Sequence, residues 1–215
     1  MKKQLQCLAA AGALGLLFTA APLAAADDDY SQGFTMVVSA GAKTCLSKAT
    51  ATVRVRPAGP VDIMDVTVQG LPANTDFDFF VLQVPKAPFG VAWYQGDIVT
   101  DKNGRGHGEF VGRFNIETFT FAQGSFAAPA VFNGPFPDAT LNPPFNPIQM
   151  YHLGLWFDSF ADAQKAGCPA TVTAFNGQHN AGIQVLNTSN FADDHGPLRD
   201  TATSSQKSNS SEGHE

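Results

Sequence analysis

Short runs of Val, Phe, Ile and Thr, separated by Gly, Pro, Asn and Asp, recur along this chain from Phe34 onward. Such runs are typical of antiparallel strands joined by turns. Apolar and polar side chains alternate strictly in residues 52–56, which predicts a strand with Val53 and Val55 in the core and its other face in water. About nine strands are expected, at residues 34–39, 51–57, 61–71, 76–84, 90–100, 107–114, 117–122, 150–157 and 181–186.

These elements predict an all-β fold, an antiparallel β-sandwich of immunoglobulin-like type. No helix of crossover length separates the strands, which excludes a parallel α/β sheet. Asn103-Gly104 supplies the positive φ angles of a tight turn, so residues 90–100 and 107–114 are predicted to pair as a hairpin. The one expected helix, residues 160–166, has Ser159 as its N-cap and Gly167 as its stop.

The two ends of the chain differ in composition from this predicted domain. Residues 1–26 combine Lys2 and Lys3, an apolar stretch and a small-residue cleavage site, as a secretory signal peptide does. We therefore expect a secreted, extracellular protein whose β-sandwich domain spans residues 27–191. Residues 192–215 are mostly Asp, Ser, Thr, His, Glu and Gly, which predicts a disordered polar tail whose deletion leaves the stability nearly unchanged.

A segment rich in proline and phenylalanine, residues 123–149, interrupts the strand pattern. It holds six Pro and four Phe without a period. Because so many aromatic side chains favour burial, the segment predicts a long ordered loop that drapes over the sandwich. If a ligand binds, we expect this loop to close over the end of the domain that carries His152 and His179; the alternative, which we favour, is a loop that only covers a sheet face.

Cysteine usage is consistent with export. Removal of the leader takes Cys7 with it and leaves Cys45 and Cys168 in an oxidising compartment. We expect these two residues to form a disulfide bond with each other; the alternative is a pair of buried free thiols.

The charge balance limits the class of partner. The chain has 13 basic and 19 acidic residues, a net charge of -6, and without Lys2 and Lys3 the balance is 11 against 19, a net charge of -8. Such an acidic surface repels nucleic acid and anionic membranes, so neither is expected as a partner. We expect a monomer whose partner is an extracellular protein or glycan.

Five segments of the chain resemble segments of known secreted proteins. Residues 76–85, 93–97, 104–107, 151–157 and 175–186 resemble a group of secreted bacterial proteins without an assigned function. The layout of strands around Leu71-Pro72 and around Thr100-Asp101 is also similar to immunoglobulin-like sandwich modules of bacterial surfaces. The resemblance spans about residues 34–191 and implies a fold, but it implies no activity.

Three histidines of the predicted domain, His107, His152 and His179, each lie within two residues of a glycine or an aromatic residue. A β-sandwich can bring such positions together at one end, and three His can bind Zn or Cu. No pair has the spacing of a metal motif, and single histidines more often bond to loops or pack near a surface. The metal hypothesis and this plain structural interpretation both remain open at this point.

Aromatic and amide side chains suggest a second kind of site, a flat surface that stacks on a sugar or another ligand. Its candidate residues are Trp93, Tyr94, Trp156, Asn176 and Asn180. The alternative, which we favour, is that both tryptophans belong to the core, as a tryptophan between two sheets commonly does.

Carboxylates offer two further hypotheses. Asp97, Asp101 and Asn103 in the predicted hairpin are oxygen ligands of the kind that Ca²⁺ prefers, although such a sequence is more often a plain turn. Asp97, Glu109 and Glu117 include the carboxylate pair that a glycosidase would need, although solvated strand carboxylates are the default. No Gly-x-Ser-x-Gly motif for a serine nucleophile is present.

The sequence therefore favours a secreted binding or interaction module, with no cofactor and no catalysis of its own, for a ligand that the sequence does not identify. The alternative is an extracellular Zn- or Cu-dependent enzyme that uses His107, His152 and His179.

Overall fold

The computed structural model describes residues 32–121 and 147–201, which form ten strands, one α-helix and two short 3-10 helices. The strands are β1 (Gln32–Val38), β2 (Thr50–Ala58), β3 (Val61–Gln69), β4 (Asp76–Leu82), β5 (Ala92–Val99), β6 (Gly106–Gly112), β7 (Phe119–Thr120), β8 (Ile148–Gln149), β9 (His152–Phe157) and β10 (Gln184–Asn187). The helical elements are η1 (Ala40–Ala42), α1 (Phe160–Lys165) and η2 (Pro197–Asp200). The predicted leader, most of the predicted loop 123–149 and residues 202–215 lie outside the described residues.

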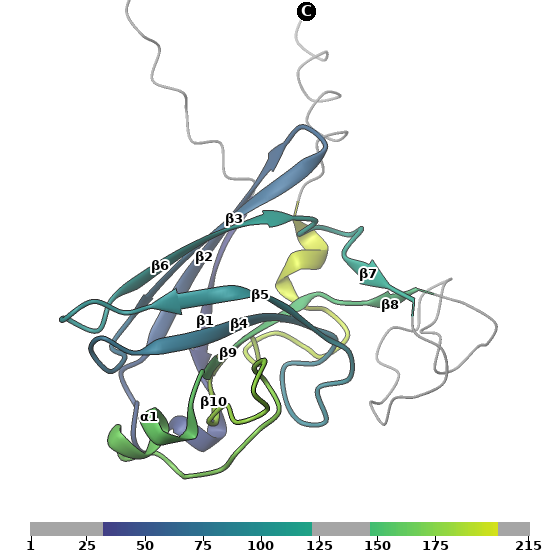
Figure 1. The fold of residues 1–215 in the computed structure, drawn as a ribbon. Helices are drawn as coiled ribbons and strands as arrows, with labels where there is room; N and C mark the ends of the chain where they lie inside the picture. Colours follow the sequence, from purple (N-terminus) through teal and green to yellow (C-terminus); the bar gives the residue numbers. More distant parts are fainter. Residues whose placement is uncertain (1–31, 122–146, 202–215) are drawn as a thin grey trace, which may run out of the picture.

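Eight strands form one antiparallel sheet in the order β5-β4-β9-β10-β1-β2-β3-β6, and β7 pairs with β8 as a separate ribbon (Figure 1). The first strand is shared between two parts of this sheet. Residues 32–36 of β1 pair with β2, and residues 37–38 pair with β10. The prediction of an all-β antiparallel domain is confirmed, as is the strict alternation in β2, where Val53 and Val55 are fully buried.

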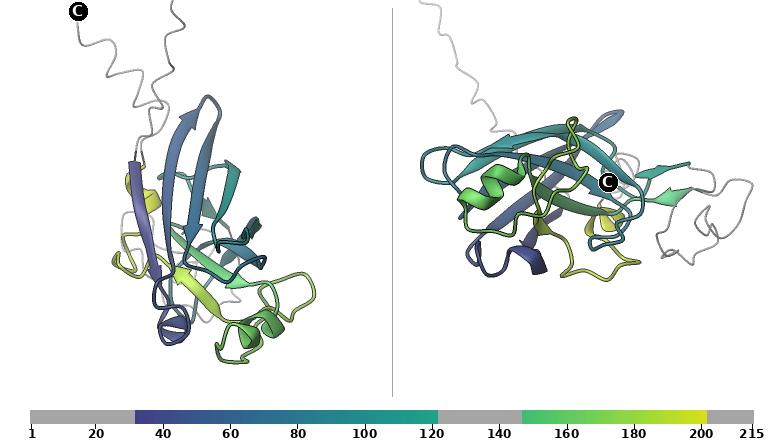
Figure 2. Two further views of the ribbon diagram at one scale, coloured as in Figure 1. Left: turned by 90° about the vertical axis from the view of Figure 1, so that its left-hand side faces the viewer. Right: turned by 60° about the horizontal axis from the view of Figure 1, so that its bottom comes forward.

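The two ends of the sheet meet across one hydrophobic core. Phe79 on β4 stacks on Phe110 on β6 with ring centroids 4.9 Å apart, although these strands are far apart in the order of the sheet. Gly96 on β5 makes room for this pair, because a Cβ there would lie 3.2 Å from the Phe110 ring. In Figure 2 the long β2–β3 pair, in blue, extends away from the end of the molecule that carries α1, in green.

One side of β4 faces a second, smaller apolar cluster. All residues from Phe77 to Leu82 are buried, which requires cover on both faces of the strand. Phe80 and Leu82 pack with Trp156 of β9 on the face opposite the main core. This outer face of the β5-β4-β9 part of the sheet carries the candidate site described below.

The prediction that the strands on either side of Asn103-Gly104 pair as a hairpin is wrong. The tight turn is present, since Gly104 donates its N–H to the carbonyl of Asp101 at 3.0 Å and has a φ of 70°. However, β5 pairs with β4, and β6 pairs with β3. The turn thus leads the chain from one end of the sheet to the other. The local sequence specifies the turn, whereas packing of distant segments decides which strands pair.

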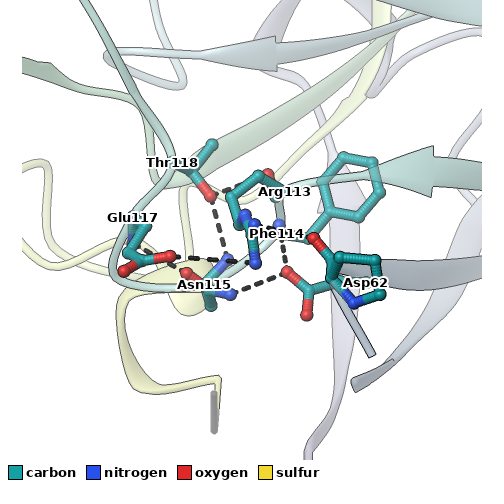
Figure 3. A network of polar contacts seen from close by, with 7 residues as sticks. Asp62, Arg113, Phe114, Asn115, Glu117 and Thr118 are labelled. Carbon is teal, nitrogen blue, oxygen red and sulfur yellow. Dashed lines mark hydrogen bonds and ion pairs between the residues drawn. The ribbon is translucent and has the colours of Figure 1, made fainter. Parts of the chain in front are cut away.

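A buried carboxylate holds the connection from β6 to β7 (Figure 3). Oδ2 of Asp62 accepts hydrogen bonds from the backbone N–H of Phe114 and from the side-chain amide of Asn115, each at 2.7 Å. Asn115 also donates its backbone N–H to the hydroxyl of Thr118 at 2.9 Å. Burial raises the pKa of Asp62, and these donors and Arg113 oppose that rise by stabilising the charged form. The network is structural, because its polar groups satisfy one another.

The disulfide bond between Cys45 and Cys168 is confirmed, with a Cα–Cα distance of 5.2 Å. It joins the chain just after η1 to the chain just after α1. The predicted caps of α1 are also confirmed: the Ser159 hydroxyl accepts a hydrogen bond from the Asp162 N–H at 3.1 Å, and Gly167 has a φ of 75°.

Residues 192–201, which their composition assigned to a disordered tail, pack against the domain. They include η2, in which Leu198 is fully buried and donates its N–H to the carbonyl of Tyr151 at 3.2 Å. Thr201 is also buried. The folded domain therefore extends past the predicted boundary at Phe191 and includes residues up to Thr201. Burial of the Leu198 side chain in the core stabilises this segment, although most of the residues around it are polar.

Candidate functional site

The two tryptophans have different environments. Trp156 is fully buried, whereas Trp93 on β5 is 62% exposed. The expectation that both belong to the core is thus correct only for Trp156. Trp93 and its neighbour Tyr94 point to opposite faces of their strand, as successive strand residues do, and they border different hollows of the surface.

Tyr94 borders a cavity of about 740 Å³. This hollow, called the acidic cavity below, lies on the outer face of β4 and β5 and is closed on one side by residues 174–178. Its aromatic wall consists of Phe80, Tyr94 and Phe175. Phe175 lies flat on the buried Trp156, with ring centroids 4.3 Å apart and an interplanar angle of 2°.

Two asparagines fix the loop that carries Phe175. Asn176 donates its side-chain N–H to the backbone carbonyl of Asp158 at 2.6 Å and to Oδ1 of Asn180 at 2.7 Å. Its own Oδ1 accepts the backbone N–H of Asn180 at 2.9 Å. Asn176 also lines the acidic cavity, and its two bonds with Asn180 shape the loop.

Gly154 explains how a tryptophan fits beneath this wall. It lies on β9 opposite Phe80. A Cβ at this position would overlap the Trp156 ring and would lie 2.8 Å from Cδ1 of Leu82. The absence of a side chain lets the indole lie over the strand, where it supports Phe175 from behind.

Four carboxylates converge on the acidic cavity: Asp76, Asp78, Asp97 and Asp158. Asp78 on β4 lies directly opposite Asp97 on β5, so their side chains share one face of the sheet. Asp76 is two residues away on that face, and Asp158 joins it through a backbone hydrogen bond, N to O, of 3.2 Å. The strand register therefore assembles the carboxylates from three separate segments.

Burial and mutual repulsion alter the ionisation of this group. Burial raises the pKa of Asp78 to about 8, reinforced by the negative charges of Asp158, Asp97 and Asp76. Burial and the charge of Asp97 also raise the pKa of Asp76. Tyr94 donates its hydroxyl to Oδ1 of Asp97 at 2.6 Å, and burial together with this bond raises the pKa of the phenol. At neutral pH the cavity thus contains a protonated Asp78 beside other carboxyl groups.

One oxygen of Asp78 has no hydrogen-bond partner among the described residues. Asp78 is only 2% exposed, and its Oδ2 accepts and donates nothing there. The indole Nε1 of Trp156, the cross-strand neighbour of Asp78 on β9, is likewise without a partner in this part of the chain. Buried polar atoms are rarely left unbonded, so the Asp78 oxygen marks a place where the lining of the cavity is chemically incomplete.

The three histidines do not form a metal site. Within residues 32–121 and 147–201, no three His, Cys, Asp or Glu side chains are grouped as metal ligands. His107 is exposed on β6, where its Nε2 lies 3.2 Å from Oδ1 of Asp65. His179 is exposed in the loop next to Asn180 and has a φ of 58°. The metal hypothesis for these residues is therefore wrong.

His152 belongs to the fold. It is fully buried, and its Nε2 donates to the carbonyl of Asp193 at 3.2 Å while its Nδ1 lies 2.9 Å from the hydroxyl of Thr188. The same hydroxyl accepts the N–H of Leu153, so it donates its own proton to Nδ1. Burial lowers the pKa of His152, which is consistent with this neutral form.

The structure does not bring together the carboxylates of the two other predicted sites, the Ca²⁺ site in the turn and the glycosidase pair. Asp101 caps its own turn, because its Oδ1 accepts the N–H groups of Asn103 and Arg105 at 2.7 and 3.0 Å. These bonds lower the pKa of Asp101. Asp97 lines the acidic cavity without Glu109 or Glu117. Neither the Ca²⁺ site of the turn nor the predicted glycosidase set is assembled.

Sequence reasoning missed most of the acidic cavity. Asp76, Asp78, Asp158, Phe80 and Phe175 were not candidates, although the first two stand in a strand that the sequence predicted. The available signal was two carboxylates in alternate positions of an otherwise apolar strand. Such residues are expensive to bury without a purpose.

Replacement of Asp78 by Asn is expected to make stability less dependent on pH. The folded protein keeps a proton on Asp78 up to about pH 8, whereas the unfolded chain releases it near the ordinary pKa of 3.8. The wild-type fold therefore loses stability through this group as pH rises between these values. Relative to wild type, Asp78→Asn should gain about 4 kcal/mol between pH 5 and pH 8.5 in urea unfolding. The exposed Asp194→Asn should show no such gain, and equal behaviour of both variants would contradict the assigned titration.

No protein-family model matches this chain, and neither does any curated protein. In the described segments, no helix is both long and apolar enough to cross a membrane. The function must therefore be inferred from the acidic cavity itself.

Proposed function

We propose that this protein is a secreted binding module that takes its ligand in the acidic cavity and has no catalysis of its own. The observation that carries the proposal is the cavity's combination of size, aromatic wall and convergent polar groups. Its volume of about 740 Å³ lies within the range of small-molecule sites. Phe80, Tyr94 and Phe175 provide flat contact surfaces, and the carboxylates provide polar groups that orient a ligand.

Secretion and fold type are part of the same proposal. The leader composition of residues 1–26 and the Cys45–Cys168 disulfide support an oxidising, extracellular compartment. We class the fold as an immunoglobulin-like β-sandwich, because the two ends of the sheet face each other across a shared core. In this class, loops commonly bind ligands; here the loop around Phe175 lies against the outer face of β4 and β9, where its ring packs on Phe80 and Trp156.

The buried tryptophan offers a direct test. The chain contains two tryptophans, so Trp93→Phe leaves Trp156, which supports the cavity wall, as the single indole. N-acetylglucosamine, cadaverine and succinate then represent neutral sugars, amines and acids in a fluorescence titration. At least one of them is expected to change Trp156 emission in a saturable way.

A blocking variant shows whether such binding uses the acidic cavity. Gly177 lines the cavity, and a Cβ built there meets nothing within 4 Å, so Gly177→Leu fills space without a backbone clash. Gly33→Leu, at an exposed position of β1, is the matched control, because its Cβ makes ordinary contacts at 3.8 Å. Binding should be lost in the first variant and kept in the second. A response to none of the probes, or one insensitive to Gly177→Leu, would overturn the proposal.

A further inference from the structure

The acidic cavity carries negative charge that the described part of the chain does not neutralise. Its ionisable lining consists of four carboxyl groups and Tyr94, with no Lys, Arg or His. The ion pairs found among the described residues involve Asp65, Asp162, Asp193, Asp200 and Glu117, and none of the four cavity carboxylates. A ligand that brings positive charge would therefore remove a repulsion that exists in the free protein.

The unpartnered oxygen of Asp78 is a second and independent sign. Asp78 is 2% exposed, its Oδ2 has no hydrogen-bond partner in the described residues, and it lies on the face that lines the acidic cavity. A carboxylate oxygen buried without a donor costs free energy. A ligand N–H placed in the cavity would supply the missing donor.

The aromatic wall indicates what kind of cation fits. The ring faces of Phe80, Tyr94 and Phe175 attract cations and also bury apolar groups. A bare metal ion needs several ligands close together, and no such group exists among the described residues. A neutral sugar could stack on the rings, but it would leave the carboxylates uncompensated. An organic cation satisfies both the rings and the charges.

We infer that the ligand of the acidic cavity is an organic cation, whose ammonium or guanidinium groups donate to Asp78 and its neighbouring carboxylates while its apolar part lies on Phe80, Tyr94 and Phe175. This inference rests on the proposed function and gives it a ligand class. Two sources share the chemistry: a free amine such as a diamine or polyamine, and a Lys or Arg side chain of another protein.

Binding of such a cation is linked to proton release. Asp78 faces Asp97 and Tyr94 from β5, Asp76 on its own strand and Asp158 from the end of β9. Burial and these neighbouring charges raise the pKa of Asp78 to about 8, so the free site is largely protonated there at neutral pH. A bound cation stabilises the ionised form. Affinity is therefore expected to increase between pH 6 and pH 8.5, with a proton released on binding below pH 8.

Isothermal titration with two probes of equal length tests the inference. Cadaverine carries an ammonium group at each end, and 1,5-pentanediol replaces both by neutral hydroxyls. We expect saturable one-to-one binding of cadaverine, at least tenfold tighter than the diol, and a heat that depends on the ionisation enthalpy of the buffer. Equal affinity of the two probes, or tighter binding of CaCl₂ than of cadaverine, would overturn the inference.

A charge-neutral variant assigns the effect to Asp78. Asp78→Asn should weaken cadaverine binding at least tenfold at pH 8.5, and the exposed Asp194→Asn should leave it unchanged. Spermidine then represents the free amines, and the peptides Gly-Lys-Gly and Gly-Arg-Gly represent side chains of another protein. Tighter binding of one kind of probe identifies the source, and binding of either kind supports the cation class. If N-acetylglucosamine or succinate binds instead, in a way that Gly177→Leu abolishes, the proposed function stands and the cation inference fails.

Discussion

Replacement of both Cys45 and Cys168 by alanine is expected to lower the free energy of unfolding by about 2–5 kcal/mol. The bond closes a loop between residues 123 positions apart, so its loss restores a large amount of conformational freedom to the unfolded chain. It also releases α1, whose six residues are too few to form a stable helix alone. The packing of Ala163 and Ala166 on the main core and the hydrogen bond from Phe160 N–H to the Asn180 carbonyl would then still hold this helix.

Urea unfolding with and without a reducing agent measures this effect. Reduction of the wild-type protein should shift its midpoint to that of the double alanine variant, and reduction should not shift the variant itself. Both measurements belong at one pH, because the titration of Asp78 changes stability independently. An unchanged midpoint after complete reduction would show that folded-state packing alone holds η1 and α1 together.

Local signals in the sequence were read correctly where the neighbouring residues decide the structure. Alternation in β2 marks a half-buried strand whatever its partner is, and Ser159 and Gly167 act on backbone groups within one helical turn. The disulfide followed from elimination, because the predicted mature chain holds two cysteines. These inferences needed no knowledge of which distant segments meet.

The pairing of strands from distant segments could not be predicted from such local signals. Asn103-Gly104 specifies a turn, but β5 and β6 bind different partners because the two ends of the sheet pack against each other through Phe79 and Phe110. The acidic cavity depends on such pairing throughout. Asp78 meets Asp97 only through the register of β4 and β5, and Phe175 reaches their face from a segment far along the chain.

Truncation after Phe191 is expected to lower the free energy of unfolding by about 3 kcal/mol or more. This is the reverse of what composition predicts for residues 192–215. The cut removes the fully buried Leu198 from the main core and the Asp193 carbonyl that accepts from the buried His152. Gly196 also packs so closely on Tyr151 that a Cβ there would overlap the Tyr151 carbonyl.

Two matched variants separate the packed segment from the residues that follow it. Truncation after Thr201 keeps every described contact of Leu198, so its unfolding midpoint should equal that of the full chain if residues 202–215 contribute as little as their composition predicts. Leu198→Ala in the full chain should cost about 2–4 kcal/mol, because a buried cavity replaces the side chain. If both truncations unfold at the same urea concentration as the full chain, η2 contributes nothing to stability and the domain ends at Phe191. A loss confined to truncation after Phe191 and to Leu198→Ala would place the end of the folded unit beyond η2, because one leucine then anchors a segment whose polar residues could not hold it in place.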